Sequence, residues 1–188
     1  MTAVLWLLVL LNLALTVRLL TWAGGVHRLA ATPAAEDWAP ELEVGAAAPT
    51  YRARLVDGGR VSEASFAGRD TAYVFLSPNC DSCRATLGKL AAFVPAARAH
   101  GTEVVVVTDT GLRQTSAWLA DAGGIAAPVV CAPVRISSLV PAYDGPAFFP
   151  YFVLVGADGL VRARGIVGRP DWLALTGVWA AVPAAGGS

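Results

Sequence analysis

The chain has 188 residues and a formal net charge of zero, with 14 basic and 14 acidic residues scattered along it. Without a basic block, the composition gives no support for nucleic acid as a partner. Three cysteines are too few for a disulfide-stapled scaffold, and the length fits one domain with an appendage.

An apolar stretch from Ala3 to Ala23 opens the chain and is interrupted by Arg18. About 20 apolar residues cross a bilayer, and an arginine near one end can extend its charged group to the interface. Trp6 and Trp22 lie near the two ends, as interfacial anchors do. No charged region precedes this long stretch, so we predict an uncleaved transmembrane anchor at residues 1–24 rather than a signal peptide.

The remaining chain divides by composition into three parts. Residues 25–45 are rich in alanine and proline and are predicted to link the anchor to a domain. Residues 46–182 alternate between apolar runs and amphipathic stretches, which indicates one folded domain. Residues 183–188 form a Gly/Ala/Ser tail that we expect to be disordered.

Within the domain, a glycine turn at 57–59 predicts a hairpin, and strands and helices then alternate. We predict strands at 71–76, 103–108, 128–131, 151–155 and 160–166, helices at 80–100, 112–122 and 171–180, and a helical turn at 136–143. Pro95 should kink or restart the first helix. Four consecutive valines at 104–107 are typical of a strand buried on both faces in a parallel pair. The expected fold class is α/β, with a mixed central sheet flanked by helices.

Cys80 and Cys83 stand between the strand at 71–76 and the helix that follows it. Unpaired backbone N–H groups and the positive end of the helix dipole stabilise a thiolate at this place. Because the thiolate is the form that attacks disulfides, Cys80 is predicted to be the nucleophile and Cys83 the resolving thiol of a redox-active disulfide. Two alternatives remain open, a structural disulfide and a zinc half-site, although zinc needs four ligands and no second C-x-x-C exists. We predict no metal and no bound cofactor.

The C-x-x-C after the first core strand, together with Phe149-Pro150 before the terminal hairpin, resembles the thioredoxin superfamily. The resemblance implies that Pro150 is cis and faces the two cysteines. It also implies that Phe149 and Pro150 line the groove in which an extended substrate binds.

A narrower resemblance is to membrane-anchored thioredoxin-like proteins of the TlpA type, and among them to the methylamine utilisation protein MauD. The segments that carry it are 5–10, 44–49, 75–83 and 150–165. Proteins of this kind are thought to handle disulfides outside the cytoplasmic membrane. MauD is thought to help mature a disulfide-rich amine dehydrogenase subunit.

Four positions depart from these families. Asn79 stands where thioredoxins carry tryptophan, and Asp81-Ser82 replaces a dipeptide that usually contains proline. Val74 occupies the strand position of the buried aspartate that accepts a proton from the resolving cysteine in thioredoxin. Proton transfer must therefore use Asp81, water or another group.

Other reactive residues have simpler interpretations. The charge of Asp81 should raise the pKa of Cys80 and favour reduction or isomerisation over oxidation, unless Asp81 is an ordinary first-turn acid. Cys131 ends a β-branched run and is expected to be a buried, inert thiol. Asp109 follows a buried strand and is expected to cap the next helix.

The predicted function is that of a membrane-tethered thiol–disulfide oxidoreductase. Its partners would be protein thiols or disulfides of a client and a second redox protein. A non-enzymatic assembly or chaperone module on the same fold is the alternative from another class. A peroxidase of the peroxiredoxin type is a further one, with Ser77 where that family typically places threonine.

The two sources of topology information disagree. His27 and Arg28 follow the apolar stretch, and positive residues favour the cytoplasmic side. Persistent disulfides belong to oxidising compartments, as the resemblance also implies. Because the charge bias is small, we predict a single-pass protein of the cell membrane with the domain outside the cytoplasm.

Overall fold

The computed structural model describes residues 6, 9–16, 18, 42–144 and 148–180. The chain divides into two compact units, Met1–Trp38 and Ala39–Ser188. In the first unit, residues 9–16 are helical and their side chains are exposed. Among the described residues, no helix is both long and apolar enough to cross a membrane. Most of the predicted anchor and linker, and the tail at 183–188, lie outside the described residues.

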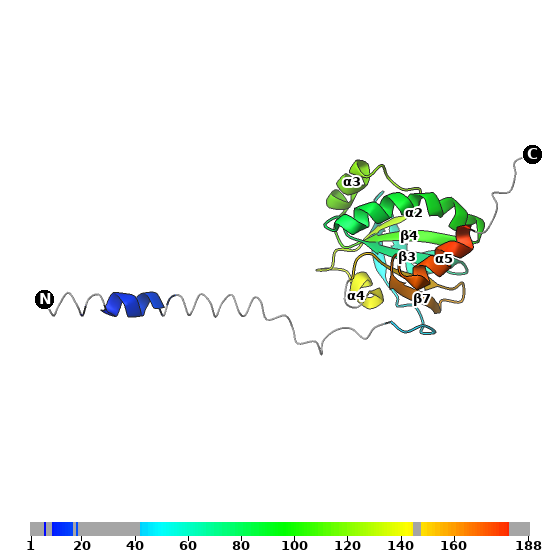
Figure 1. Cartoon of the computed structure of the whole chain (residues 1–188). Coiled ribbons are helices and arrows are strands. Elements are labelled where there is room, and N and C mark those ends of the chain that lie inside the picture. Colours follow the sequence, from blue (N-terminus) through cyan, green and yellow to red (C-terminus); the bar gives the residue numbers. More distant parts are fainter. Residues whose placement is uncertain (1–5, 7–8, 17, 19–41, 145–147, 181–188) are drawn as a thin grey trace, which may run out of the picture. The chain divides into compact units, whose positions relative to one another are not determined.

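The second unit is built on one seven-stranded mixed sheet (Figure 1). The strands lie in the order β2-β1-β5-β4-β3-β6-β7. Their bounds are Arg52–Leu55 for β1, Arg60–Ser62 for β2, Asp70–Leu76 for β3, Thr102–Thr108 for β4, Val129–Cys131 for β5, Tyr151–Val155 for β6 and Val161–Ile166 for β7. β3 pairs in parallel with β4 and antiparallel with β6, which confirms the mixed sheet. The predicted hairpin joins the sheet because β1 pairs with β5.

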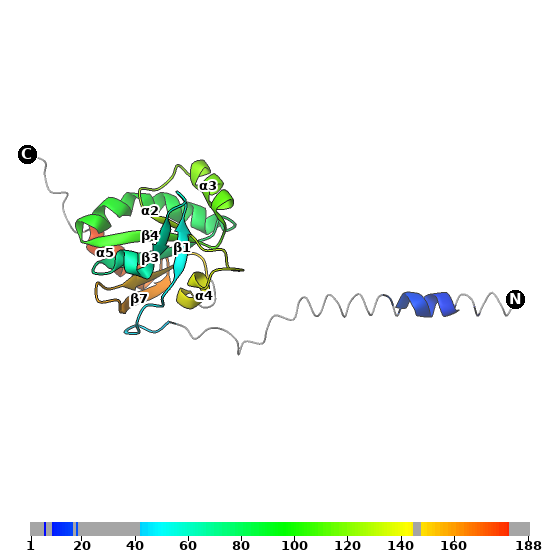
Figure 2. The ribbon, with the colours of Figure 1, turned by 180° about the vertical axis from the view of Figure 1, so that it is seen from behind.

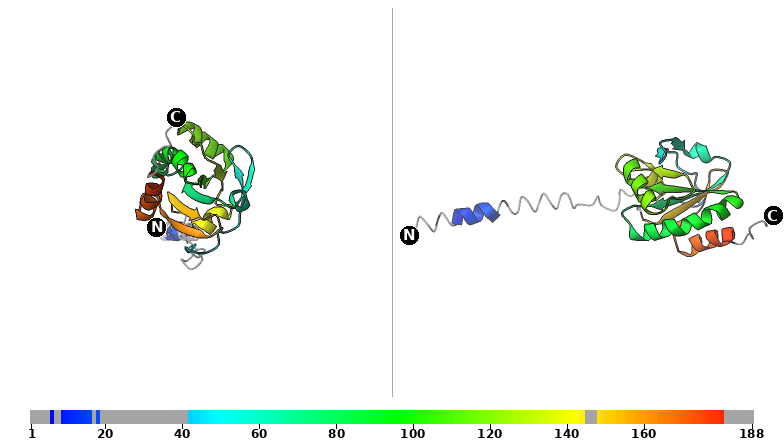
Figure 3. Two further views of the ribbon diagram at one scale, coloured as in Figure 1. Left: turned by 90° about the vertical axis from the view of Figure 1, so that its right-hand side faces the viewer. Right: turned by 90° about the horizontal axis from the view of Figure 1, so that it is seen from above.

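Helices cover both faces of this sheet (Figure 3). Their bounds are Glu63–Phe66 for the short helix η1, Asp81–Ala99 for α2, Leu112–Asp121 for α3, Leu139–Tyr143 for α4 and Pro170–Ala180 for α5. α2 and α5 lie over one face, and Figure 2 shows β1 and α4 from the other side. The sequence did not predict η1; the other element types and their order agree with the prediction, and their bounds differ by a few residues at most.

Two cores separate along the alternating strand positions. Ala72, Val74 and Leu76 of β3 face α2 and α5, where Trp172 packs edge-on against Phe152 with ring centroids 5.3 Å apart. The intervening Tyr73 and Phe75 face the α4 side, among aromatic rings in mostly edge-to-face contact. This period of two explains why β3 is apolar at nearly every position: both of its faces are buried.

Pro95 does not end its helix, so of the predicted kink or restart the restart is wrong. α2 continues from Asp81 to Ala99 with Pro95 inside it. A proline removes one backbone hydrogen bond, but the buried residues Leu90, Val94 and Ala97 pack against the sheet on both sides of it. This tertiary packing holds the turn that the local preference of proline would break.

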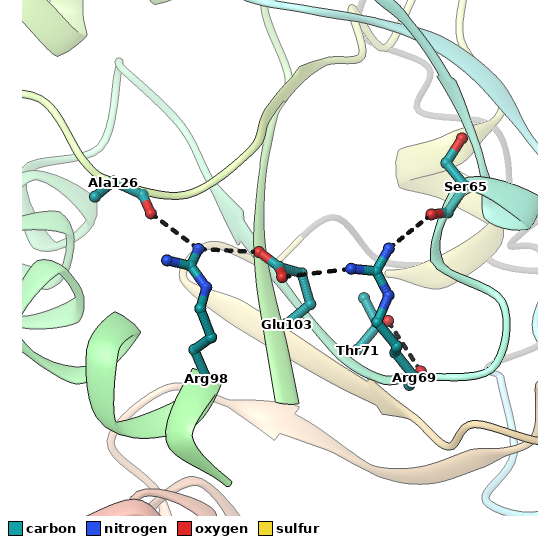
Figure 4. Close-up of polar contacts among 6 residues, drawn as sticks. All are labelled: Ser65, Arg69, Thr71, Arg98, Glu103 and Ala126. Carbon is teal, nitrogen blue, oxygen red and sulfur yellow. Dashed lines mark hydrogen bonds and ion pairs between the residues drawn. The ribbon is translucent and has the colours of Figure 1, made fainter. Parts of the chain in front are cut away.

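Two arginines pair with one carboxylate at the end of the sheet opposite the cysteines (Figure 4). Glu103 of β4 lies 3.3 Å from Arg98 of α2 and 3.8 Å from Arg69, which precedes β3. Arg98 also donates to the Ala126 carbonyl, and Arg69 to the Ser65 carbonyl. One partly buried acid thus connects α2, the strand β4, the short helix η1 and two loops.

Candidate active site

The two cysteines lie where β3 ends and α2 begins. Cys80 is the N-cap of α2 and has extended backbone angles, and its sulfur accepts a hydrogen bond from the Cys83 N–H at 3.3 Å. Cys83 sits in the first helical turn, so its side chain points back toward the N-cap. The predicted placement of the pair at a helix N-terminus is confirmed.

Both cysteines are free thiols, and their sulfurs are 2.6 Å apart. The Cys83 thiol donates to the Cys80 sulfur, and the Ser82 hydroxyl lies 3.0 Å from the same sulfur. Cys80 is partly exposed, whereas Cys83 is completely buried against Leu87 and the sheet. A reagent from solvent can therefore reach Cys80 and not Cys83.

Their surroundings shift the two thiol pKa values in opposite directions. Burial alone would raise the pKa of Cys80, but hydrogen bonds from the side chains and backbone of Cys83 and Ser82 outweigh it, and the pKa is lowered. Burial, followed by the hydrogen bond to Cys80, raises the pKa of Cys83 to about 12. Asp81 is not among the groups that shift the pKa of Cys80, and the direction is opposite to the increase expected from its charge. Cys80 is the more acidic thiol, as predicted.

The second predicted segment lies against the first. The Phe149-Pro150 bond is cis, and the Phe149 carbonyl oxygen is 3.9 Å from the Cys80 sulfur. β6 starts just after Pro150 and pairs with β3 with Tyr151 opposite Phe75, which brings this segment to the cysteine end of the sheet. All four predicted site residues are therefore brought together by the fold.

Asp109 is the functional candidate that sequence reasoning assigned wrongly. Gly111, not Asp109, is the N-cap of α3, and no side chain caps that helix. The Asp109 carboxylate instead accepts a 2.9 Å hydrogen bond from the Ser77 hydroxyl, next to the cysteine loop. Because β3 and β4 are parallel neighbours, residues after both strands meet at one edge, and this pattern could have revealed the contact.

Cys131 is buried and lies on β5, away from the pair. Burial raises the pKa of its thiol, against hydrogen bonds from Thr115 and Thr108. These features confirm the prediction of a buried thiol. Among the described residues, no three His, Cys, Asp or Glu side chains are arranged to hold a metal ion.

A separate hollow of about 850 Å³ lies beside the β1–β2 hairpin. Arg52, Arg54 and Arg60 line it, together with the start of α3 and the loop after β5. None of the four predicted site residues lines this hollow.

The profile of the AhpC/TSA family matches residues 44–164, about two thirds of the chain, including the cysteine pair and the cis proline. The chain belongs to the AhpC/TSA family. No curated protein sequence matches it.

Solved structures with the same fold come from several organisms. A secreted disulfide oxidoreductase of Mycobacterium tuberculosis, homologous to Escherichia coli DsbE, has 19% identity and a TM-score of 0.55, covering 70% of this chain and 95% of that one. A thiol:disulfide interchange protein of Chlorobium tepidum has 22% identity and a TM-score of 0.58, covering 73% and 96%. A Plasmodium vivax 2-Cys peroxiredoxin has 19% identity and a TM-score of 0.60, covering 73% and 94%. At these identities, the similarity establishes a thioredoxin-like fold for this AhpC/TSA member.

Proposed function

We propose that this protein is a thiol–disulfide oxidoreductase that acts on cysteines of partner proteins, by disulfide reduction or isomerisation. The observation that carries the proposal is the pair of free thiols with opposite pKa shifts. Cys80 is accessible and acidified, and Cys83 is buried with its proton held. A reactive thiol beside a protected one is what attack followed by intramolecular resolution requires.

The reaction would proceed in two exchanges. The Cys80 thiolate attacks a client disulfide, forms a mixed disulfide and releases the first client thiolate. Cys83 then loses its proton and attacks the Cys80 sulfur, which releases the second client thiolate and leaves a Cys80–Cys83 disulfide. The client gains two electrons and two protons in total. A separate redox protein must then supply two further electrons, with two protons, to reduce the Cys80–Cys83 disulfide again.

The client would bind along the segment that precedes β6. The Phe149 carbonyl lies beside the attacking sulfur, and the neighbouring Phe148 is 58% exposed. An extended client strand could pair with this backbone while its disulfide reaches Cys80. Phe149 and Pro150 are therefore proposed as the substrate-binding residues.

Membrane attachment and the client class form a finer proposal. The apolar stretch at 3–23 supports a single membrane anchor, and the resemblance to TlpA-type proteins supports a domain outside the cytoplasm. The resemblance to MauD suggests a disulfide-rich enzyme, such as an amine dehydrogenase subunit, as the client.

A peroxidase is the second candidate, favoured by the AhpC/TSA match and by the similarity to a 2-Cys peroxiredoxin. Here the buried Cys83 already contacts the Cys80 sulfur, so a peroxide-oxidised Cys80 would also be resolved within the loop. The candidates differ in substrate: the reduced protein should reduce protein disulfides much faster than it consumes hydroperoxides at equal concentration. The reverse order would favour the peroxidase.

Trapping tests the main proposal directly. Cys83→Ala removes the resolving thiol, so the mixed disulfide between Cys80 and its client should accumulate. Non-reducing electrophoresis and mass spectrometry would identify the trapped protein, with the Cys80→Ser/Cys83→Ala double variant as control. Complementation by Cys80→Ser alone would instead support a non-enzymatic assembly role.

A further inference from the structure

A partly buried carboxylate without full hydrogen bonding contacts the cysteine loop through Ser77. Asp109 follows β4, and its Oδ2 accepts the hydrogen bond from the Ser77 hydroxyl at 2.9 Å. Its Oδ1 is buried and has no hydrogen-bond partner among the described residues. An unsatisfied buried carboxylate oxygen is costly, so its retention calls for a functional explanation.

Ser77 connects this carboxylate to the cysteine loop. Its hydroxyl contacts Asp109 and accepts from the Asn79 N–H at 3.2 Å, while its backbone hydrogen-bonds to the Cys83 thiol. Asp109 also interacts electrostatically with Cys83, and its negative charge disfavours the Cys83 thiolate. The carboxylate and the buried thiol thus share one contact residue and act on each other's charge.

The charged groups around this pair are few. Cys83 faces Cys80 from the N-cap of its own helix and Asp109 from the end of β4. Asp109 has no ion pair with a basic side chain of the described residues. Val74 of β3 is fully buried, so this strand places a methyl-bearing side chain, not an acid, in the core that contains Cys83. Asp109 is the carboxylate whose charge acts on the resolving thiol.

We propose that Asp109, held by Ser77, is the proton acceptor for Cys83 during resolution. In the mixed disulfide, the Cys83 thiol gives its proton to the unpartnered Oδ1 of Asp109. The Cys83 thiolate attacks the Cys80 sulfur, and the Cys80–client bond breaks as the Cys80–Cys83 bond forms. The proton on Asp109 then passes to the departing client thiolate, so no other acid or base is needed.

The raised pKa of Asp109 suits this role. Burial raises it, against hydrogen bonds from Ser77 and from the residue's own backbone. A carboxylate of higher pKa is a stronger base, which narrows the gap to a thiol whose pKa is about 12. The orphaned oxygen, the Ser77 contact and the charge interaction therefore have one common explanation.

The experiment separates the two exchanges, because the inference rests on the proposed function. The reduced full-length protein is mixed with excess aromatic disulfide, and the coloured thiolate is followed by stopped flow from pH 5 to 10. The first released thiolate reports attack by Cys80, and the second reports resolution by Cys83. At pH 7, Asp109→Asn should keep the rate constant of the first phase within about twofold of wild type. It should lower the rate constant of the second phase about a hundredfold, which is the lower end of the range for a general base.

The pH profile distinguishes proton transfer from a structural effect. In the wild type, the rate constant of the second phase should increase with pH as Asp109 loses its proton and should then reach a plateau. In Asp109→Asn, this rate constant should increase steadily as the pH approaches the Cys83 pKa, without a plateau. Asp109→Glu keeps a carboxylate and should restore part of the plateau. Asp158→Asn, an exposed carboxylate paired with Arg162, should behave as wild type.

Each outcome has a clear meaning. A wild-type protein that releases no thiolate overturns both the proposed function and the role of Asp109. A normal first phase with an unchanged second phase in Asp109→Asn overturns the role of Asp109 alone. If Asp109→Asn does not fold, Ser77→Ala serves instead: it removes the contact to Oδ2, and it should slow the second phase selectively or the proposal fails.

Discussion

The Phe149 carbonyl oxygen lies 3.9 Å from the Cys80 sulfur, although the two residues are 69 positions apart in the chain. The pairing of β3 with β6 creates this proximity, because Cys80 follows the end of β3 and Phe149 precedes the start of β6. Antiparallel neighbours place those two points at the same edge of the sheet. A single strand pair therefore positions both the Cys80 sulfur and the segment that we propose binds the client.

The exposure and pKa values of the thiols predict the order of alkylation. With limiting iodoacetamide near pH 7, Cys80 of the reduced protein should be modified first, because it is accessible and more often ionised. Cys83 and Cys131 are buried with raised pKa values and should react slowly. Peptide mass spectrometry at increasing times measures the order. Earlier labelling of Cys83 would reverse the proposed roles.

Burial of Asp144 predicts that folding stability depends on pH. The residue is fully buried, and burial raises its carboxyl pKa from 3.8 to about 7, against one hydrogen bond from the Phe148 N–H. Between these values the folded state keeps a proton that the unfolded state has lost. The contribution of Asp144 to the free energy of unfolding is therefore complete below about pH 4. It decreases as the pH rises to about 7, by a few kcal/mol in all.

Asp144→Asn should remove that dependence. The amide keeps an oxygen for the Phe148 N–H and carries no charge, so the variant should be more stable than wild type at pH 8 and about equal at pH 4. Urea unfolding at several pH values measures the free energy of unfolding. Asp158→Asn, on the exposed β6–β7 turn, is the matched control. If the free energy of unfolding changed with pH equally in wild type and Asp144→Asn, burial of Asp144 would not be the cause of the pH dependence.

The sequence predicted local features well where one physical effect dominates. Strand β3 and helix α2 followed from apolar periodicity, and the cis Pro150 came from the family resemblance. Asp109 could not be assigned in the same way, because its partner Ser77 is 32 positions away and comes close only through strand pairing. The restart expected at Pro95 is wrong for a related reason, since packing of the apolar face of α2 overrides the local preference of proline.

Glu103 is predicted to contribute to stability through its two arginine partners. Its side chain is 14% exposed and lies within ion-pair distance of Arg69 and Arg98. Glu103→Gln should destabilise the protein by about 1–2 kcal/mol, since partly buried charged hydrogen bonds contribute more than exposed ones. Chemical denaturation provides the measurement.

A surface ion pair supplies the control for this prediction. Asp121 and Arg84 are 2.6 Å apart, but their side chains are 70% and 50% exposed. Asp121→Asn should change stability by less than about 0.5 kcal/mol, because water and salt screen such pairs. Similar losses in both variants would mean that the Glu103 network has no special role.

The class of client that we propose depends on the side of the membrane on which the domain lies. His27 and Arg28 favour a cytoplasmic domain, whereas a dithiol that exchanges with persistent disulfides needs a compartment where such disulfides exist. We expect the domain to face outward, because one or two flanking positive charges are a weak signal and the rule applies best to short loops.

Intact cells expressing the protein are reduced mildly and treated with a membrane-impermeant maleimide, with Cys80→Ser as the control for specificity. Labelling of Cys80 without lysis supports the outward orientation. Labelling only after lysis would place the domain in the cytoplasm, and the client would then have to be a cytoplasmic protein with transient disulfides.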